Sequence, residues 1–334
     1  MEQVYIIAEI GQAHDGSLGI AHSFIDALAG TGIDAIKFQT HIAEAESSPF
    51  EPFRVKFSYS DKSRYDYWKR MEFTIDEWRE IKTHCETSGV DFISTPASLE
   101  AVNLLEELEV KKYKVGSGDV GNWLLLEKIA RTGKEIILSS GLSTYKEIEN
   151  AIDKIRNHGN KISLLQCTTK YPTEAKDIGL NNILEFKKRF DLPVGFSDHS
   201  GTIYPSFAAV SLGATILEFH VAFDKRMFGP DSSSSLIISE VETLVEGVRF
   251  IESSIHNEID KNNIENFDEL RRIFGKSLAV NKDKKQGEIL YFDDLESKKP
   301  SGYGIDVRDF EEVIGKKLRK DLSKWSFIKS KDLL

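Results

Sequence analysis

The chain has 334 residues, of which 40% are hydrophobic and 29% charged, a composition typical of a globular protein. Its formal net charge of -10 argues against a nucleic-acid-binding face, which would be basic. The two cysteines form no CxxC pair, the N-terminus lacks the features of a signal peptide, and no apolar run is long enough to span a membrane. We therefore expect a cytoplasmic protein without nucleic-acid or membrane partners.

Short apolar runs alternate with amphipathic stretches over about 255 residues, which predicts strands alternating with helices. The predicted strands are Val4–Ala8, Ala35–Phe38, Phe92–Ser94, Lys112–Val115, Glu135–Leu138, Ile162–Leu165, Val194–Ser197 and Thr215–Phe219. The predicted helices are Leu18–Ala29, Ile75–Ser88, Ser98–Leu108, Trp123–Thr132, Tyr145–Asn157, Asn181–Phe190, Ile203–Leu212 and Ser239–Ile255. This regular alternation predicts an α/β fold of the (β/α)8 TIM-barrel type, with a doubly wound open sheet as the alternative.

Two segments depart from this alternation. A polar and aromatic excursion runs from Thr40 to Thr74, and we expect its part Ser47–Arg70, rich in Phe, Tyr and Arg, to shape a substrate pocket. After the barrel pattern, residues 257–273 are polar and read as a linker. The predicted domains are thus a barrel over residues 1–256, this linker, and a small domain over residues 274–334.

The small domain shows short strand-like runs at Ser277–Val280, Glu288–Tyr291 and Leu295–Lys298, followed by a loop at Lys299–Gly304. A unit of about 60 residues builds only a marginal core of its own. We therefore expect it to lean on the barrel or on a neighbouring subunit.

Every predicted barrel strand ends in polar residues. Because the carboxyl ends of barrel strands face the active site, these clusters predict one polar mouth that binds a small hydrophilic molecule. In chain order the residues are Glu9, Lys37, Gln39, Ser94, Thr95, Lys114, Ser117, Ser139, Ser140, Gln166, Thr168, Ser197, His199, Glu218 and His220.

His199 and His220 would leave adjacent strands at the same end of the barrel, where they could hold one divalent metal between two imidazoles. The alternative is that each is a helix-cap or core histidine with its hydrogen bonds satisfied. Asp231, just beyond His220, could ligate the metal, orient a water or cap the turn that follows.

Lys37 and Lys114 each end an apolar strand. A lysine in this position can bind phosphate or carboxylate, form a Schiff base, or pair with a carboxylate such as Glu9 or Glu218. The small-residue loops Val115–Asp119 and Ser139–Gly141 could present backbone N–H groups to a phosphate beside these lysines.

The segments IAEIGQAHDGS, IKFQTH, FISTP, YKVGSGD, ILSSG, LQCTTKYPT, GFSDHS and ILEFH occur in this order along the chain. With these motifs the chain resembles the sialic acid (nonulosonic acid) synthase family, and residues 274–334 resemble that family's SAF, or antifreeze-like, domain. The resemblance implies a transferase that condenses phosphoenolpyruvate with an amino-sugar aldose, such as N-acetylmannosamine, to a sialic, legionaminic or pseudaminic acid plus phosphate.

The resemblance also implies roles for individual residues. His199 and His220 would bind a divalent metal, usually manganese, with magnesium or cobalt as alternatives, and Glu9, Lys37, Lys114 and Glu218 would be catalytic. The implied substrate-binding residues are Gln39, Thr95, Ser117, Asp119, Ser139, Thr169, Tyr171, Ser197, Asp231 and Lys299. Members of the family are domain-swapped homodimers in which the SAF domain of one subunit caps the barrel of the other.

A few positions depart from the family pattern. Ala13-His14 stands where Asn-His is usual, Asp119 where glutamate is common, Ala97 where phenylalanine is common, and Lys299 where the SAF loop often has an arginine. A lysine does not reproduce the bidentate fork of an arginine. These four changes fall mainly where we expect the sugar to be recognised, so they bear mainly on which sugar is bound.

Two other functions remain open at this point. One is a Schiff-base aldolase that uses Lys37 or Lys114 and no metal. The other is a non-enzymatic protein whose SAF-like tail binds carbohydrate or a partner, although a scaffold has no need to bury so many polar strand ends.

Overall fold

The computed structural model describes residues 3–55 and 57–334, so that Lys56, within the predicted excursion, lies outside the described residues. The chain forms two compact units, one ending at Asn257 and the other running from Glu258 to Leu334. Within the described residues, no helix is long and apolar enough to cross a membrane.

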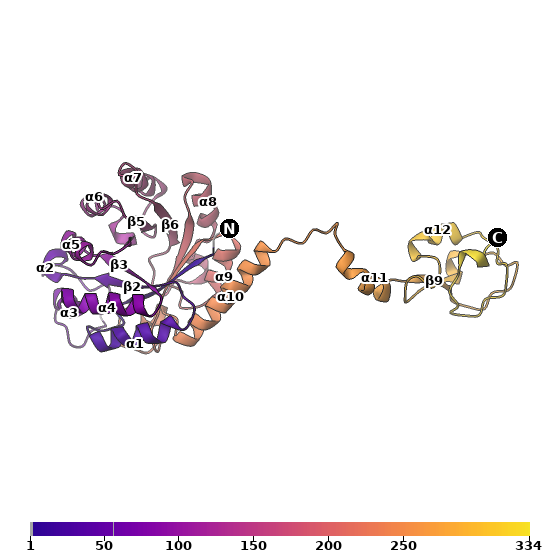
Figure 1. Cartoon of the computed structure of the whole chain (residues 1–334), viewed down its shortest axis with the longest axis horizontal. Helices are drawn as coiled ribbons and strands as arrows, with labels where there is room; N and C mark the ends of the chain where they lie inside the picture. Colours follow the sequence, from indigo (N-terminus) through magenta and orange to yellow (C-terminus); the bar gives the residue numbers. More distant parts are fainter. Residues whose placement is uncertain (1–2, 56) are drawn as a thin grey trace. The chain divides into compact units, whose positions relative to one another are not determined.

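The first unit is a closed barrel of eight parallel strands, which confirms the predicted (β/α)8 architecture and excludes the doubly wound sheet (Figure 1). Each strand pairs with the next in sequence, and β1 closes the barrel against β8. The strands are β1 (Tyr5–Gly11), β2 (Ala35–Thr40), β3 (Asp91–Pro96), β4 (Lys112–Val115), β5 (Glu135–Ser139), β6 (Ile162–Cys167), β7 (Val194–Asp198) and β8 (Ile216–His220).

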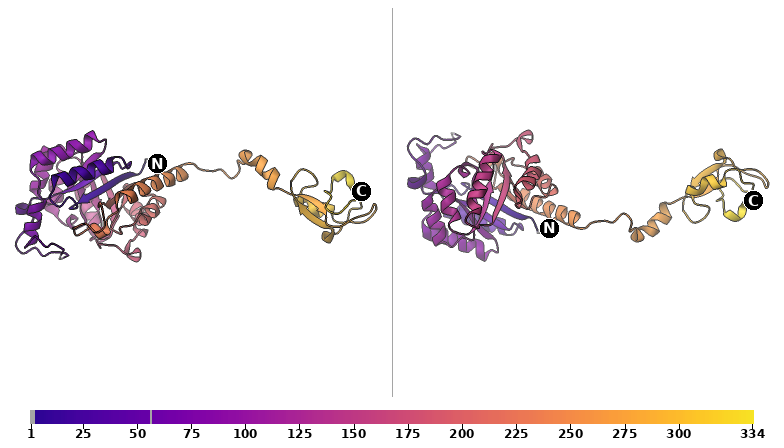
Figure 2. Two further views of the ribbon diagram at one scale, coloured as in Figure 1. Left: turned by 90° about the horizontal axis from the view of Figure 1, so that it is seen from below. Right: turned by 90° about the horizontal axis from the view of Figure 1, so that it is seen from above.

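Helices surround these strands in all three views (Figures 1 and 2). They are α1 (Leu18–Ala29), α4 (Ile75–Thr87), α5 (Leu99–Glu107), α6 (Trp123–Ala130), α7 (Tyr145–Arg156), α8 (Asn181–Phe190), α9 (Tyr204–Ser211) and α10 (Ile238–His256). Their apolar faces and the outward-facing strand residues form one large buried core, so the hydrophobic period of each segment fixes its place in the barrel.

A second, smaller apolar cluster fills the inside of the barrel. Strand side chains alternate between the two faces of the sheet, so Ile6 and Ala8 pack under the helices whereas Ile7 points to the barrel axis. The residues of this inner layer are Ile7, Ala35, Ile93, Ile137, Leu165 and Ile216.

The excursion after β2 contains two helices that were not predicted, α2 (Ala43–Glu46) and α3 (Arg64–Met71). A capping box between Ser63 and Asp66 starts α3, whose buried side chains pack with Phe53 and Phe57 into a small cluster of their own. Polar residues between the aromatic ones hide this helical period in the sequence.

The second unit has its own small core, formed by Leu278, Val280, Leu290, Val313, Leu318, Leu322 and Ile328. Strand β9 (Ser277–Val280) pairs antiparallel with β10 (Leu295–Lys298), and a short helix α12 spans Phe310–Val313. Helix α11 (Asp268–Phe274) occupies the end of the segment that was predicted to be a linker.

The predicted strand Glu288–Tyr291 is wrong. Only one isolated bridge, from Ile289 to Lys317, forms there. The N–H of Tyr291 donates to the Asp294 carboxylate at 3.0 Å, and a turn begins at Phe292. The side chain of Asp294 thus takes a backbone donor that a longer strand would need.

The close packing of β7 against its neighbours leads to a test. A Cβ added at Gly195 would lie 2.5 Å from the carbonyl oxygen of Ile216 on β8 and would also meet Leu165. We expect Gly195→Ala to lower the free energy of unfolding by about 1–3 kcal/mol, because the backbone of a closed barrel has little room to move. Gly121→Ala is the matched control, since a Cβ there meets nothing within 4 Å. Urea denaturation of both variants measures the difference, and equal stability would contradict this packing.

Candidate active site

A cavity of about 330 Å³ lies at the carboxyl ends of the barrel strands. It brings together all but two of the sixteen residues that the family resemblance implied for the site. Four further residues predicted for the polar mouth do not line it, because their side chains bond to neighbouring residues of the fold: Ser94, Ser140, Gln166 and Thr168. The predicted residues that line it are Glu9, Lys37, Gln39, Thr95, Lys114, Ser117, Asp119, Ser139, Thr169, Tyr171, Ser197, His199, Glu218 and His220.

The period of the strands explains why these side chains meet. Six of the lining residues each follow a member of the inner apolar layer by two positions: Glu9, Lys37, Thr95, Ser139, Cys167 and Glu218. Residues two apart on a strand share a face, so the polar side chains form a second layer directly above the apolar one. The apolar layer is therefore the floor of the cavity.

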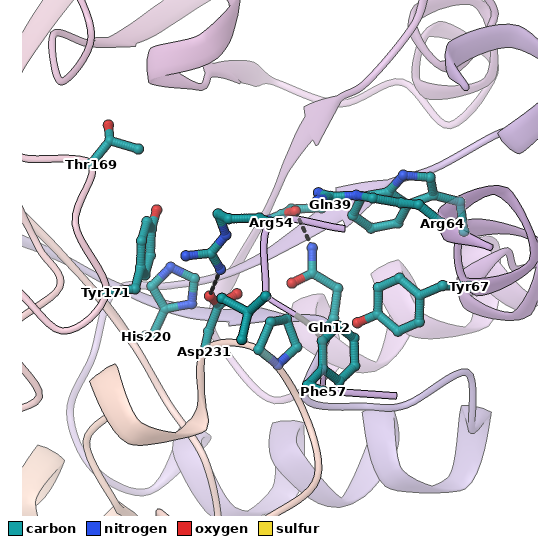
Figure 3. A pocket seen from close by; sticks show the side chains of 13 residues that line it. Gln12, Gln39, Arg54, Phe57, Arg64, Tyr67, Thr169, Tyr171, His220 and Asp231 are labelled. Carbon is teal, nitrogen blue, oxygen red and sulfur yellow. Dashed lines mark hydrogen bonds and ion pairs between the residues drawn. The ribbon is translucent and has the colours of Figure 1, made fainter. Parts of the chain in front are cut away.

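A second cavity of about 190 Å³ adjoins the first and shares six lining residues with it: Gln39, Arg64, Trp68, Thr169, Tyr171 and His220. Asp231 lines this outer cavity, where it pairs with Arg54 at 2.6 Å (Figure 3). The Arg54 guanidinium also lies 4.2 Å from the centre of the Tyr171 ring. The remaining predicted residue, Lys299, belongs to the second unit, where its ammonium group lies over Phe274.

In the first cavity, here called the inner cavity, three oxygen atoms surround the ammonium group of Lys37. Its Nζ lies 2.5 Å from Glu9 Oε2, 3.2 Å from Thr95 Oγ1 and 4.0 Å from Glu218 Oε1. Burial alone would lower the pKa of Lys37, but the charges of Glu218 and Glu9 outweigh it and the pKa is raised. Lys37 is therefore a permanent cation in this cavity.

Lys114 has a weaker set of partners. Its Nζ lies 2.7 Å from Ser139 Oγ and 3.5 Å from Glu218 Oε1. Burial, with the nearby charge of Lys37, lowers the pKa of Lys114 despite the attraction of Glu218. Both lysines in turn lower the pKa of Glu218 to about 2, although burial opposes this. Of the three roles considered for these lysines, pairing with Glu9 and Glu218 is the one that their contacts in this structure show.

Two buried lining atoms have neither a hydrogen-bond nor an ion-pair partner among the described residues, Oε2 of Glu218 and Oγ1 of Thr169. A buried polar atom without a partner costs free energy, and a bound polar molecule can supply that partner. These atoms therefore mark places where a ligand would gain hydrogen bonds.

The two predicted metal-binding histidines lie side by side, with ring centres 5.3 Å apart. His199 Nδ1 donates to the carbonyl of Thr168 at 2.8 Å, which fixes the tautomer and leaves the lone pair on Nε2, 3.0 Å from the Tyr171 hydroxyl. Burial lowers the pKa of both histidines, so both rings are neutral near pH 7.

Neutral imidazoles are donors that a borderline divalent metal prefers, and His199 has a second-shell hydrogen bond as well. The pair therefore fits such an ion. Among residues 3–55 and 57–334, no group of three or more His, Cys, Asp or Glu side chains is arranged to hold a metal. A metal bound here would need further ligands from water or substrate.

Several lining residues were not singled out from the sequence. Arg64 and Trp68 line both cavities, His41 and Cys167 line the inner one, and the outer one is also lined by Gln12, Arg54, Val55, Phe57, Tyr67 and Pro230. Most of them belong to the excursion or precede it closely. The composition of the excursion indicated a pocket wall but not which side chains face inward.

Comparison with known proteins identifies the family. The model of the NeuB family matches residues 24–260. An N,N'-diacetyllegionaminic acid synthase of Campylobacter jejuni is 36% identical over 322 residues, which cover 95% of this chain and 96% of that protein. The human N-acetylneuraminate-9-phosphate synthase is 34% identical over 318 residues, which cover 94% of this chain and 88% of that protein.

A solved structure agrees with these matches. The N-acetylneuraminic acid (sialic acid) synthetase of Leptospira borgpetersenii, in complex with citrate, superposes with a TM-score of 0.71 at 30% identity, covering 81% of this chain and 93% of that one. The family suggested by the motifs is thereby confirmed. The chain belongs to the NeuB family of sialic acid synthases.

Proposed function

We propose that this chain condenses phosphoenolpyruvate with an N-acylated amino-sugar aldose to give a nonulosonic acid and phosphate. The observation that carries the proposal is one cavity with two buried lysines on β2 and β4 and two neutral imidazoles at the ends of β7 and β8. The lysines suit an enol phosphate, and the imidazoles suit a metal that activates an aldehyde. The names of the relatives point to the same class of product.

The lysines would hold the phosphate and carboxylate of phosphoenolpyruvate, with the hydroxyls of Thr95, Ser117 and Ser139 as further donors. Bonding of C3 of phosphoenolpyruvate to the aldehyde carbon leaves positive charge at C2. Glu218, whose low pKa keeps it ionised, is suited to stabilise that charge. Water then adds at C2, and phosphate leaves with cleavage of its C–O bond.

His199 and His220 would hold the divalent metal, for which we propose manganese, with magnesium or cobalt as alternatives. The bound ion would polarise the aldehyde oxygen of the open-chain sugar. Tyr171, whose hydroxyl meets His199 and whose ring contacts Arg54, would orient the acceptor together with Gln39 and Asp231. Lys299 stays a prediction as a sugar contact.

We also propose a homodimer in which the C-terminal unit, as an SAF domain, caps the barrel of the partner. Large exposed apolar side chains lie at the cavity end of the barrel helices, including Trp123 at 53% exposure, Leu142 at 64% and Tyr204 at 73%. Such a rim is typical of a surface that a protein partner covers. The two buried free cysteines fit the reducing cytoplasm in which we place the enzyme.

A Schiff-base aldolase remains the second candidate, because a lysine with a lowered pKa, such as Lys114, is the usual nucleophile of that chemistry. Treatment with borohydride in the presence of pyruvate separates the two. We expect no covalent adduct at Lys114 or Lys37 by mass spectrometry. A stable adduct at either lysine would favour the aldolase.

The metal role predicts that His220→Ala loses at least about 10²-fold in turnover while the fold is kept, since one of two protein ligands is removed. The measurement is phosphate release from phosphoenolpyruvate with N-acetylmannosamine, its 6-phosphate and a 2,4-diacetamido-2,4,6-trideoxyhexose as acceptors. EDTA should abolish activity in the wild type, and manganese should restore it there but not in the variant. Undiminished activity of metal-stripped His220→Ala would exclude the metal role.

The charge cluster predicts a pH-dependent stability. Because the pKa of Glu218 lies at about 2 in the folded chain, below its ordinary 4.5, its stabilising effect is complete above pH 4.5 and lost as the pH falls through 2. Glu218→Gln should therefore be about 3–5 kcal/mol less stable than the wild type at pH 7, because it leaves buried ammonium groups without their carboxylate. This difference should shrink between pH 4.5 and 2.

Denaturant titrations across this pH range measure the effect. Glu242→Gln, on the exposed face of α10, is the control and should match the wild type throughout. A Glu218→Gln protein as stable as the wild type at pH 7 would show that the lysines do not depend on this carboxylate.

A further inference from the structure

The inner cavity contains a histidine–carboxylate pair that the mechanism above does not use. His41 directly follows β2, and its ring lines the cavity. Its Nδ1 lies 2.8 Å from Glu46 Oε1, and both side chains are only 7% exposed. With Nδ1–H donated to the carboxylate, the lone pair of the neutral ring is on Nε2. The amide nitrogen of Gln12 lies 3.5 Å from that Nε2, as a donor facing an acceptor would.

The orientation of this ring is fixed from several sides. Trp68 stacks on His41 with ring centres 4.0 Å apart and an angle of 16° between the planes. The indole is held in turn, since its Nε1 donates to Glu51 at 3.1 Å and the Arg64 guanidinium lies 4.8 Å from its ring centre. A base with a carboxylate on one nitrogen and a fixed ring plane is the arrangement expected of a general acid–base catalyst.

Other ionisable groups of the cavity already have different partners. Glu9 and Glu218 pair with the lysines, and His199 and His220 form the proposed metal site. His41 lies two residues beyond Gln39, on the side of the strand end and so further from the apolar floor than Lys37. Gln39, which the proposed function assigns to the acceptor sugar, lines the same cavity.

We propose that His41, positioned by Glu46, catalyses the opening of the acceptor's sugar ring. The inference rests on the proposed function, because an amino-sugar aldose in water is mainly a cyclic hemiacetal, and phosphoenolpyruvate reacts only with its open aldehyde. His41 is the catalytic residue of this step. Glu46 is a positioning residue that acts through the imidazole.

Nε2 of His41 removes the proton from the hydroxyl on C1 of the sugar, and the electron pair of that O–H bond becomes the second bond of the aldehyde. The bond from C1 to the ring oxygen breaks, and its electron pair stays on the ring oxygen. That oxygen takes a proton from water, and the resulting hydroxide takes the proton back from the imidazolium.

The first experiment compares an acceptor that closes into a ring with one that does not. Phosphate release is measured with N-acetylmannosamine and with 2-acetamido-3-hydroxypropanal, which is too short to form a five- or six-membered ring. On N-acetylmannosamine, His41→Gln should lose about 10²-fold or more in kcat, as is typical for removal of a general acid–base group. On the short aldehyde it should keep most of the wild-type rate, which also shows that the variant is folded.

Glu46→Gln should also lose kcat on N-acetylmannosamine but not on the short aldehyde. The loss should be about 10-fold, a tenth of that in His41→Gln, since this change disturbs only the orientation of the imidazole ring. The KM for phosphoenolpyruvate should stay unchanged in both variants. His84→Gln is the matched control, because His84 also pairs with a carboxylate, Asp26 at 3.0 Å, but lies on α4 outside both cavity linings. It should match the wild type on both acceptors.

The second experiment uses the sugar alone. NMR saturation transfer measures exchange between the anomers of N-acetylmannosamine with manganese-free enzyme and no phosphoenolpyruvate. The wild type and His84→Gln should accelerate this exchange, and His41→Gln should not. Equal losses on both acceptors, or wild-type exchange no faster than in buffer, would overturn the role of His41. If no acceptor yields phosphate in the wild type, the synthase proposal fails, whereas anomer exchange still reports on His41.

Discussion

The site depends on the placement of two ammonium groups in the interior of a barrel. An isolated lysine would lose its charge there, and the structure prevents this for Lys37 by setting it between Glu9 and Glu218. Lys114 shares Glu218 with it but pairs with no second carboxylate, so burial lowers the pKa of Lys114 whereas the pKa of Lys37 is raised. The carboxylate of Glu218 thus lies against both ammonium groups and lines the cavity with them.

Much of this arrangement could be predicted from the sequence, because each barrel strand is an apolar run that ends in polar residues. Two positions beyond Ile7 stands Glu9, and two beyond Ala35 stands Lys37, so strand period and barrel geometry together place these side chains in one layer. The imidazole pair followed from the same logic, with His199 and His220 at the ends of adjacent strands. Local pattern and fold agree in this part of the chain.

The side chains of the excursion after β2 could not be placed in the same way. Which of its side chains line the cavities depends on tertiary contacts between residues that are distant in the sequence. Examples are the contacts of Arg54 with Asp231 and of Trp68 with His41. No period in the sequence encodes them. In the second unit, the N–H of Tyr291 donates to the carboxylate of Asp294. The segment Glu288–Tyr291 therefore does not form the strand that its composition favoured. Side-chain hydrogen bonds to the backbone are hard to foresee from residue preference.

The apolar layer of Ile7, Ala35, Ile93, Ile137, Leu165 and Ile216 has a consequence for how molecules reach the site. Since these side chains close the barrel below the reactive groups, nothing enters or leaves from underneath. Both reactants, the water that is consumed, and the two products all share a single doorway.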